Sequence, residues 1–436
     1  MKRHVITRRK LVKGLATGAL GASLVRSAGP ALGALGANER MVIGCIGTGG
    51  QGTFHLGQWA KMKDVRIAAI CDVDTSHRDR AVQLAGSSPK GLKDFREVLQ
   101  MKEVDAVCIA TPDHWHAILA IQACRAGKHV YVEKPIGHNI KEGRVIAEAA
   151  TKAGVVVLHG TQQRSDPHWI NAVKRIKAGE LGKVGMVHVW NAWNTKEMFG
   201  KLATASDGEP PPGVDYDRWL GPAPARPFNP VRFHGSFYFF WDYSGGMMTA
   251  WAVHLFDIVL WAMGPQINSV TAVGGKFVFD DPRDTPDTAD AVFECPGYTM
   301  VYTMRHGNGW RPHGDLDHGI EFFGTEATLH VNRAGFQVYR DEDRASRKPF
   351  YSEPAVGGWD QSFIEHKRHF LDCIRTGAAL RCDAQTGHVG SIPGHLANVS
   401  YRVGHKVRWD AKTESVIEDA DAARLLGREY RAPWHL

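Results

Sequence analysis

The feature that most constrains this chain is a glycine-rich turn directly after an apolar run. Met41–Ile46 is almost wholly apolar without alternation, which is typical of a strand buried on both faces of a parallel sheet. The sequence Gly47-Thr48-Gly49-Gly50-Gln51-Gly52 follows at once, and a helical pattern begins behind it. The chain therefore carries G-x-G-x-x-G in the strand-turn-helix context that dinucleotide binding requires.

The glycines predict where the pyrophosphate of a dinucleotide lies. Gly47 permits a tight turn, Gly49 allows close approach of the backbone, and Gly52 lets the helix pack on the strand. Free N–H groups and the dipole at the helix N-terminus favour negative charge there. The expected cofactor contacts in this turn are Gly47, Gly49, Gly50, Gln51 and Gly52.

A carboxylate follows the second apolar run, Val65–Cys71. Asp72 stands 20 residues beyond Gly52, the distance at which an acid hydrogen-bonds the ribose of the adenosine. It would accept a hydrogen bond from a free 2′-hydroxyl and repel a 2′-phosphate, so NAD is expected rather than NADP. The alternative is a turn-forming role shared with Asp74.

Further apolar runs, separated by amphipathic helices, continue the α/β pattern. Val104–Ala110, His129–Val132 and Val155–His159 are expected strands, so residues 38–160 are predicted to form a doubly wound Rossmann domain. In such sheets ligands bind beyond the strand C-termini. Two strand ends carry reactive side chains at that edge: Thr111-Pro112-Asp113-His114-Trp115-His116 and Glu133-Lys134-Pro135.

The glycine loop, the T-P-x-x-x-H segment and E-K-P, in this order, resemble the glucose-fructose oxidoreductase, inositol dehydrogenase and MocA family. The resemblance extends from about residue 40 to the end. It implies cofactor contacts from Thr111, Pro112, His116, Glu133 and Lys134. It also implies that residues 161–436 form an α+β domain with a large open, mainly antiparallel sheet, which binds substrate and forms a homo-oligomer, a dimer or tetramer.

The family's helix pattern G-G-x-x-x-D-x-x-x-H-x-x-D is matched from Gly245 to Asp257, except that Ala250 replaces the first Asp. His254 suits a general base because its ordinary pKa is close to the working pH. Lys134 suits a cation beside a developing oxyanion. These two are the predicted catalytic residues, and Asp257 or Asp242 are candidates to replace the missing carboxylate.

The substrate is expected to be a small carbohydrate or polyol. His254 and Asp257, spaced i, i+3, are expected on one face of a helix. A Pro/Gly/Asp-rich stretch, residues 196–235, is too long for an ordinary connection and is expected to shape or cover a site. The predicted substrate contacts are Gln163, Arg164, Trp251, His254 and Asp257.

The formal charge of +7 comes from the N-terminus. Residues 1–37 carry seven bases and no acid, so the remainder has 46 bases and 46 acids, which removes the electrostatic argument for nucleic acid. The paired arginines Arg8 and Arg9 before a weakly apolar stretch resemble a twin-arginine signal peptide, which predicts export of a folded protein to the periplasm. Beyond this leader no membrane segment is expected.

No metal site is predicted. The seven cysteines form no C-x-x-C pair, and no third ligand is spaced to join His114 and His116.

Three functions fit these features. The first is an NAD-dependent oxidoreductase acting on a secondary hydroxyl of a sugar, polyol or glycoside. The second is a redox-neutral sugar-converting enzyme, such as an isomerase, an epimerase or an NAD-dependent glycosidase, with tightly retained NAD. The third, suggested by Ala250, is a cofactor-bound sugar-binding protein without catalysis.

Overall fold

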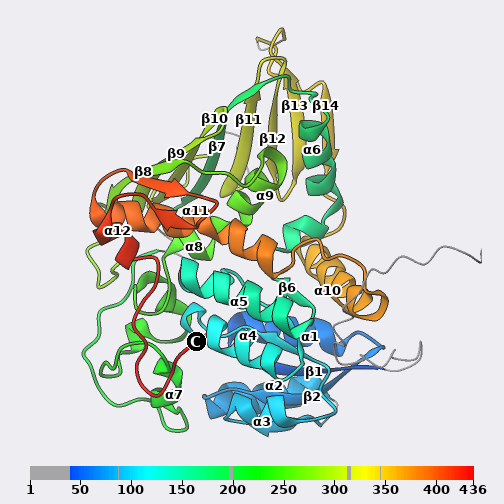
Figure 1. Ribbon diagram of the computed structural model, residues 1–436, viewed down its shortest axis with the longest axis vertical. Coiled ribbons are helices and arrows are strands. Elements are labelled where there is room, and N and C mark those ends of the chain that lie inside the picture. The colour runs from blue at the N-terminus through cyan, green and yellow to red at the C-terminus, as the bar shows by residue number, and fades with distance from the viewer. Residues whose placement is uncertain (1–39, 87, 196–199, 312–315, 344) are drawn as a thin grey trace, which may run out of the picture. The chain divides into compact units, whose positions relative to one another are not determined.

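The computed structural model describes residues 40–86, 88–195, 200–311, 316–343 and 345–436, and all of them belong to one compact unit. The predicted leader, residues 1–37, lies outside the described residues. Two β-sheets organise the unit, the six-stranded sheet in the lower half of Figure 1 and the ten-stranded sheet in the upper half.

The six-stranded sheet is parallel, in the order β3-β2-β1-β4-β5-β6. The runs predicted as strands form it because their side chains are buried on both faces. β1, β2 and β5 have the predicted bounds; β3 was not predicted, because only Leu92 of its three residues is buried. The strands are β1 (Met41–Ile46), β2 (Val65–Cys71), β3 (Lys90–Leu92), β4 (Ala106–Ile109), β5 (His129–Val132) and β6 (Val157–His159).

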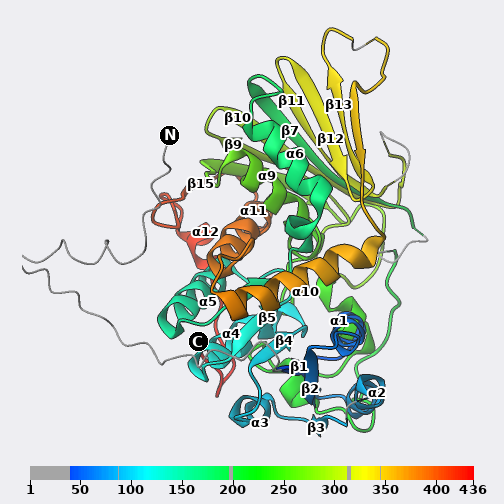
Figure 2. The same cartoon turned by 90° about the vertical axis from the view of Figure 1, so that its right-hand side faces the viewer.

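Helices cover both faces of this sheet. α3 (Phe95–Gln100), α4 (His116–Arg125) and α5 (Ile140–Ala153) share one apolar cluster with it. α1 (Gly50–Ala60) and α2 (Thr75–Ala85) share the other. α10 (Trp359–Thr376) joins that second cluster through Phe370 and Leu371, and Figure 2 shows it running along this domain. The C-terminal part of the chain therefore completes the core of the Rossmann domain.

The ten-stranded sheet has the order β14-β13-β12-β11-β7-β10-β9-β8-β15-β16 and is antiparallel except for the pair β7 and β10. α6 (Pro167–Lys177), α9 (Val253–Met263) and α11 (Ala384–Val403) contact one face. Buried and exposed residues alternate along β9 and β10, as expected for a sheet with one covered face. The strands are β7 (Val184–Trp193), β8 (Ser269–Gly275), β9 (Thr288–Cys295), β10 (Tyr298–His306), β11 (His318–Gly324), β12 (Ala327–Asn332), β13 (Gly335–Arg340), β14 (Tyr351–Pro354), β15 (Val407–Asp410) and β16 (Ser415–Val416).

The observed fold confirms the predicted class, a Rossmann domain followed by an α+β domain with a mainly antiparallel sheet. No helix in the described part of the chain combines the length and apolar character needed to cross a bilayer. The short helices are α7 (Tyr216–Leu220), α8 (Met247–Ala250) and α12 (Ala420–Arg424), with 3₁₀ turns η2 (Asp113–Trp115), η3 (Gln162–Ser165), η4 (Pro230–Arg232) and η5 (His234–Phe239).

A buried ammonium fastens α10 to the Rossmann domain. Lys367 is fully buried, and its Nζ donates to Gln58 Oε1 of α1 (2.6 Å). Four aromatic rings surround this Nζ with centroids 5.4–5.7 Å away, those of Phe54, Trp59, Tyr131 and Phe363. Burial lowers the pKa of Lys367 to about 8, although the charge of Glu133 opposes the shift.

This lowered pKa makes a prediction about stability. Between about pH 8 and pH 10.5 the unfolded chain holds a proton on Lys367 that the folded chain has released, so raising the pH through this window favours the folded state. We expect the unfolding free energy of the wild type, relative to Lys367→Met, to rise by up to about 3 kcal/mol across it. Urea denaturation at pH 7.5 and pH 10.5 measures this, with the exposed Lys63→Met as control. A pH-independent difference would contradict the prediction.

Candidate cofactor and substrate pocket

A cavity of about 1000 Å³ lies at the C-terminal edge of the parallel sheet. Side chains of both domains line it, and its size is at the upper end for ligand pockets. Asp72 after β2 and Lys134 after β5 both line it, and three strand steps, about 14 Å, separate these strands. The cavity is therefore long enough for an extended ligand lying across the strand ends.

The glycine loop is shaped to approach a phosphate. Gly47 has a φ of +81°, and a Cβ there would lie 2.8 Å from Thr111 atoms. A Cβ on Gly52 would lie 2.0 Å from the Gly47 carbonyl oxygen, whereas one on Gly50 would meet nothing within 4 Å. α1 begins at Gly50, its N-cap residue Gly49 provides no side-chain cap, and its first turn contains no acid. Its N–H groups thus remain available to an anion, and the residues fit a dinucleotide pyrophosphate.

Asp72 lines the pocket as an oriented acceptor. Its Oδ2 accepts a hydrogen bond from the Thr48 amide (2.7 Å), and its Oδ1 accepts one from the Asp74 amide (2.9 Å). These two bonds hold the carboxylate beside the glycine loop. A ribose hydroxyl could donate to it there, whereas a 2′-phosphate would meet a negative charge, as predicted for NAD.

The other predicted cofactor residues divide into two groups. Gly47, Gly49, Gly50, Gln51, Thr111, Pro112, Glu133 and Lys134 line the pocket with Asp72, whereas Gly52 and His116 do not. The His116 ring nitrogens lie 2.7 Å from the Pro135 carbonyl oxygen and 2.9 Å from that of Thr111, so His116 braces the two loops from behind. His114 likewise lies against a carbonyl, that of Trp219 (2.9 Å).

Glu133 is a buried carboxylate beneath the pocket. Its Oε1 lies 2.7 Å from His55 Nε2, and its Oε2 accepts a hydrogen bond from the Lys134 amide (3.2 Å). Burial alone would raise the pKa of Glu133, but the hydrogen bond and charge of His55 and the charge of Lys134 hold it well below its usual range. Glu133 is therefore ionised and fixes the turn that carries Lys134.

The predicted catalytic residues line the same pocket. The Lys134 ammonium lies 6.0 Å from the Tyr238 ring centroid and has no hydrogen bond or ion pair with any described residue. His254 is 5% exposed, and its Nδ1 has no hydrogen-bond partner. Burial, then the charges of Arg333 and Lys134, lower the pKa of His254 well below its ordinary value. At neutral pH His254 is an uncharged imidazole that can accept a proton.

Neither acid proposed to replace the missing carboxylate at Ala250 reaches Lys134. Asp257 accepts two hydrogen bonds from Arg164, at 2.7 and 2.8 Å, and Asp242 is paired with Arg226. Neither lines the pocket, although Ala250 does. Each carboxylate is bound to a guanidinium instead, so the structure supports neither of the two candidates.

Asp113 is a further acid that lines the pocket with Lys134. It is 2% exposed, and Ser244 Oγ donates to its Oδ2 (2.5 Å). Burial raises the pKa of Asp113, while the charges of His116 and Lys134 and the Ser244 bond oppose the rise. Its place directly after a parallel strand, within the T-P-x-x-x-H segment, was the signal that could have identified it.

The predicted substrate residues also divide. Trp251 and His254 line the pocket, whereas Gln163, Arg164 and Asp257 do not. The i, i+3 spacing did not bring Asp257 to the pocket with His254, because the buried pairing with Arg164 holds it elsewhere. Sequence reasoning missed four further lining residues, which come from the ten-stranded sheet and its turns: Trp193, Asp317, His318 and Arg333.

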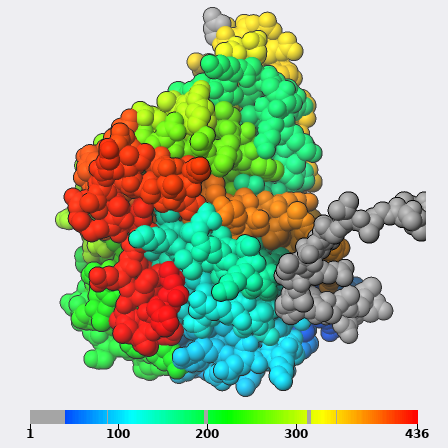
Figure 3. All heavy atoms as spheres, in the orientation of Figure 1, coloured from blue at the N-terminus to red at the C-terminus, as the bar shows by residue number. Residues whose placement is uncertain are grey.

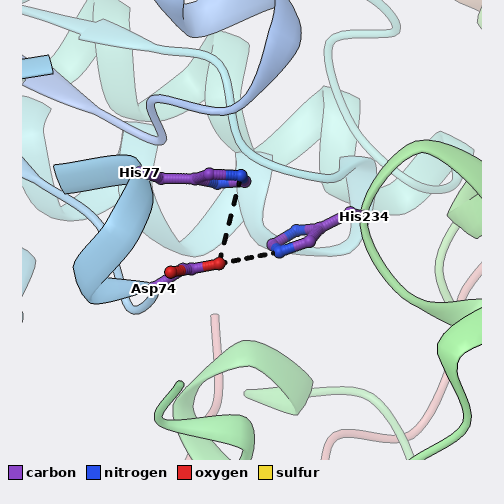
Figure 4. A group of neighbouring side chains, drawn as sticks. All are labelled: Asp74, His77 and His234. Atoms are coloured by element: carbon purple, nitrogen blue, oxygen red, sulfur yellow. Dashed lines mark hydrogen bonds and ion pairs between the residues drawn. The ribbon is translucent and has the colours of Figure 1, made fainter. Parts of the chain in front are cut away.

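The described part of the Pro/Gly/Asp-rich stretch covers the Asp72 end of the pocket. The Thr75 amide and hydroxyl donate to the Gly213 carbonyl (3.2 and 2.8 Å), and His234 Nε2 donates to Asp74 Oδ2 (3.0 Å). Figure 4 shows Asp74 facing both His77 and His234, whose ring centroids lie 4.3 Å apart. His234 has a φ of +49°, a conformation that is costly for a residue with a Cβ.

The same three residues, Asp74, His77 and His234, have donor atoms within 4.8 Å of one another, a spacing that a divalent cation can bridge. The direct Asp74–His234 hydrogen bond accounts for their approach. Sequence reasoning did not identify this group, since His234 is distant in the chain from α2.

The chain after α12 forms a C-terminal tail, which covers the Asp72 end of the pocket from another side. Trp434 lines the pocket, and its ring packs against Trp115 (4.8 Å between centroids) and Phe95 (6.4 Å). Arg431 Nε donates to the Gly221 carbonyl (2.8 Å), which ties the tail to the covering stretch. Figure 3 shows the tail, in red, lying against the green and the cyan parts of the chain.

Comparisons with known proteins agree with this architecture. The chain is 25% identical over 380 residues to myo-inositol 2-dehydrogenase of Thermotoga maritima, covering 85% of this chain and 99% of that protein. Over 154 residues it is 32% identical to α-N-acetylgalactosaminidase of Shewanella oneidensis, covering 33% and 34%. Levoglucosan dehydrogenase in complex with NADH has the same fold, with a TM-score of 0.66, 21% identity, and 85% and 99% coverage.

Two family profiles match consecutive parts of the chain. The profile described as "Oxidoreductase family, NAD-binding Rossmann fold" matches residues 41–161. The profile described as "Oxidoreductase family, C-terminal alpha/beta domain" matches residues 170–288. Together they span more than half of the chain, and the protein therefore belongs to the Gfo/Idh/MocA family of NAD-binding oxidoreductases.

Proposed function

We propose that the protein interconverts a secondary hydroxyl and a ketone on a sugar, polyol or glycoside, with Lys134 and His254 as the acid–base pair. The observation that carries the proposal is that an ammonium and an uncharged imidazole line one pocket with the glycine loop and Asp72. Bound NAD supplies the hydride acceptor or donor for this chemistry. The relatedness to myo-inositol 2-dehydrogenase and the shared fold of levoglucosan dehydrogenase support the substrate class.

The two side chains have complementary tasks in the oxidation. The uncharged His254 ring accepts the proton of the substrate hydroxyl, since its lowered pKa keeps the lone pair free at neutral pH. The Lys134 ammonium stabilises the negative charge that develops on the oxygen, and it does so effectively because few polar groups compete for it. In the reduction the same groups act in reverse, and the protonated base returns its proton to the oxygen.

Replacing the base tests this assignment. We expect His254→Gln to lower kcat by about 10²- to 10⁴-fold while NAD still binds. Because burial lowers the pKa of His254, the wild-type oxidation rate should persist as pH falls below 6.5 and decline only further down. Absorbance at 340 nm with a sugar and polyol panel measures the rates, and calorimetry measures NAD binding. The exposed His405→Gln serves as control; an unchanged kcat in His254→Gln would exclude the assignment.

A second candidate function is a redox-neutral conversion in which NAD stays bound and is reduced and reoxidised on one substrate. The covering stretch and the tail enclose the Asp72 end of the pocket, which favours slow cofactor exchange. The local identity to α-N-acetylgalactosaminidase is consistent with it.

In this candidate function, retention of NAD depends on the hydrogen bond between His234 and Asp74, which fastens the covering stretch. We expect His234→Ala to accelerate NADH dissociation by about 10-fold, since a hydrogen bond to a charged acceptor is lost. Stopped-flow displacement of bound NADH measures the rate, and the NAD content after desalting measures retention. His405→Ala, remote from the stretch, should behave as wild type. If the wild type loses all NAD on desalting, the redox-neutral candidate fails and the dehydrogenase proposal remains.

We also propose that residues 1–37 direct export by the twin-arginine route and that the mature protein is a homo-oligomer. The paired arginines support export, and exposed apolar side chains on the uncovered face of the ten-stranded sheet, Met186, Val292 and Phe323, support self-association. Cell fractionation should place the protein in the periplasm, and Arg8→Lys with Arg9→Lys should retain it in the cytoplasm. Light scattering should give the mass of a dimer or tetramer.

A further inference from the structure

The pocket contains a guanidinium that the proposed chemistry does not use. Arg333 lies in the turn between β12 and β13 and lines the cavity with Lys134 and His254. Its Cζ lies 4.7 Å from the ring centroid of Trp251, so one face of the guanidinium packs on the indole. The edge of the group remains available for hydrogen bonding, the orientation in which arginine binds planar anions.

Arg333 lacks a counter-ion among the described residues. Its one hydrogen bond is a long contact from Nη2 to Gln163 Oε1 (3.5 Å), and its buried Nε has no partner. Burial lowers the pKa of Arg333 to about 10, so it remains charged at neutral pH. Arg333 as a whole is half-buried, and a cation partly withdrawn from water without a counter-ion is unfavourable, which makes the pocket receptive to an anion.

The carboxylates near Arg333 are each bound elsewhere. Asp317 accepts hydrogen bonds from His318 Nδ1 (2.6 Å) and Trp193 Nε1 (2.8 Å). Asp166 pairs with His168 (2.8 Å) and Glu133 with His55 (2.7 Å). Their charges act on Arg333, yet none forms an ion pair with it. Arg164 provides the contrast, because its guanidinium is matched by both oxygens of Asp257.

A second polar atom in the part of the pocket near Arg333 also lacks a hydrogen-bond partner. Because Asp317 accepts from His318 Nδ1, that nitrogen carries the proton and Nε2 is a hydrogen-bond acceptor. Nε2 is buried and unpaired, and His318 lines the pocket with its ring 4.6 Å from that of Trp251. The two orphaned groups thus both pack against Trp251, one suited to an anion and the other to a hydroxyl.

We propose that Arg333 binds a carboxylate of the substrate, and therefore that the protein acts on a sugar acid, such as a uronate or its glycoside, in preference to the neutral sugar. This inference rests on the proposed function, since it assigns the substrate class of the same pocket. The carboxylate forms a two-point contact with the guanidinium edge, and a hydroxyl of the same substrate donates to His318 Nε2. The hydroxyl that reacts faces His254 and Lys134.

Matched substrate pairs test the proposal. D-glucuronate, D-galacturonate and their methyl glycosides are compared with glucose, galactose and the corresponding methyl glycosides on the NAD-loaded full protein. Calorimetry gives Kd, and absorbance at 340 nm gives kcat and KM. The wild type should favour at least one acid over its neutral partner by 10-fold or more. Arg333→Gln should raise Kd and KM for that acid by about 10²-fold and change Kd and KM for the neutral sugars far less.

Two further variants show whether the charge or the planar shape of the Arg333 side chain binds the acid, and whether a loss of folding explains the effect. Arg333→Lys keeps the charge without the planar edge and should recover only part of the affinity for the acid. Arg340→Gln, an exposed arginine at the far end of β13, should match the wild type throughout. NAD affinity and the thermal unfolding midpoint should be similar in all three variants, which shows that the pocket is intact.

The outcomes distinguish this inference from the function on which it rests. If neutral sugars are oxidised, no acid is favoured and Arg333→Gln affects both classes equally, the inference is wrong and the dehydrogenase proposal stands. If an acid binds through Arg333 but no substrate is oxidised, the carboxylate site stands and the catalytic proposal fails. Preference for glucose 6-phosphate over glucuronate, or binding of no acid at all, would overturn the inference.

Discussion

Parallel hydrogen bonding in the six-stranded sheet is the constraint on which the pocket depends. Because all six strands run in one direction, the residues after β1, β2, β4 and β5 emerge at the same edge, where the glycine loop, Asp72, Asp113 and Lys134 line one cavity. The backbone of Gly47 turns there through a left-handed conformation, and neither Gly47 nor Gly52 has room for a Cβ. A side chain at Gly47 would clash with Thr111, and one at Gly52 would clash with the Gly47 carbonyl, so either would disrupt the turn.

The second domain depends on a different interaction. Arg164 follows β6 of the first sheet, and Asp257 lies on α9 of the second domain. Their two hydrogen bonds, with Arg164 also packed 4.9 Å from the Trp261 ring centroid, fix the rotation of α9 against the end of the Rossmann domain. His254 is one turn earlier on the same helix, so this buried pair sets the position of the base relative to Lys134. A substrate contact was predicted for these residues, yet their effect on the site is through orientation.

The parts of the fold that could be predicted are those whose signal is local. β1, β2 and β5 have the predicted bounds because each is a continuous apolar run between clear breakers. β3 was missed because three residues with one buried side chain leave no pattern. Apolar patterns thus predicted the Rossmann domain without its shortest strand, whereas the architecture of the second domain was predicted from the family resemblance.

Residues of the site could be predicted only where they follow the end of a strand or belong to a recognised motif. Asp72, Lys134 and His254 met those conditions and line the pocket. Arg333 and His318 lie in a β-turn and at the start of a strand of the ten-stranded sheet, and only the register of that sheet brings them beside Trp251. Asp113 shows the limit from the other side. The sequence places it within a recognised motif, but only the fold shows that Asp113 is buried and lines the same pocket as Lys134, at a site where Ala250 supplies no carboxylate.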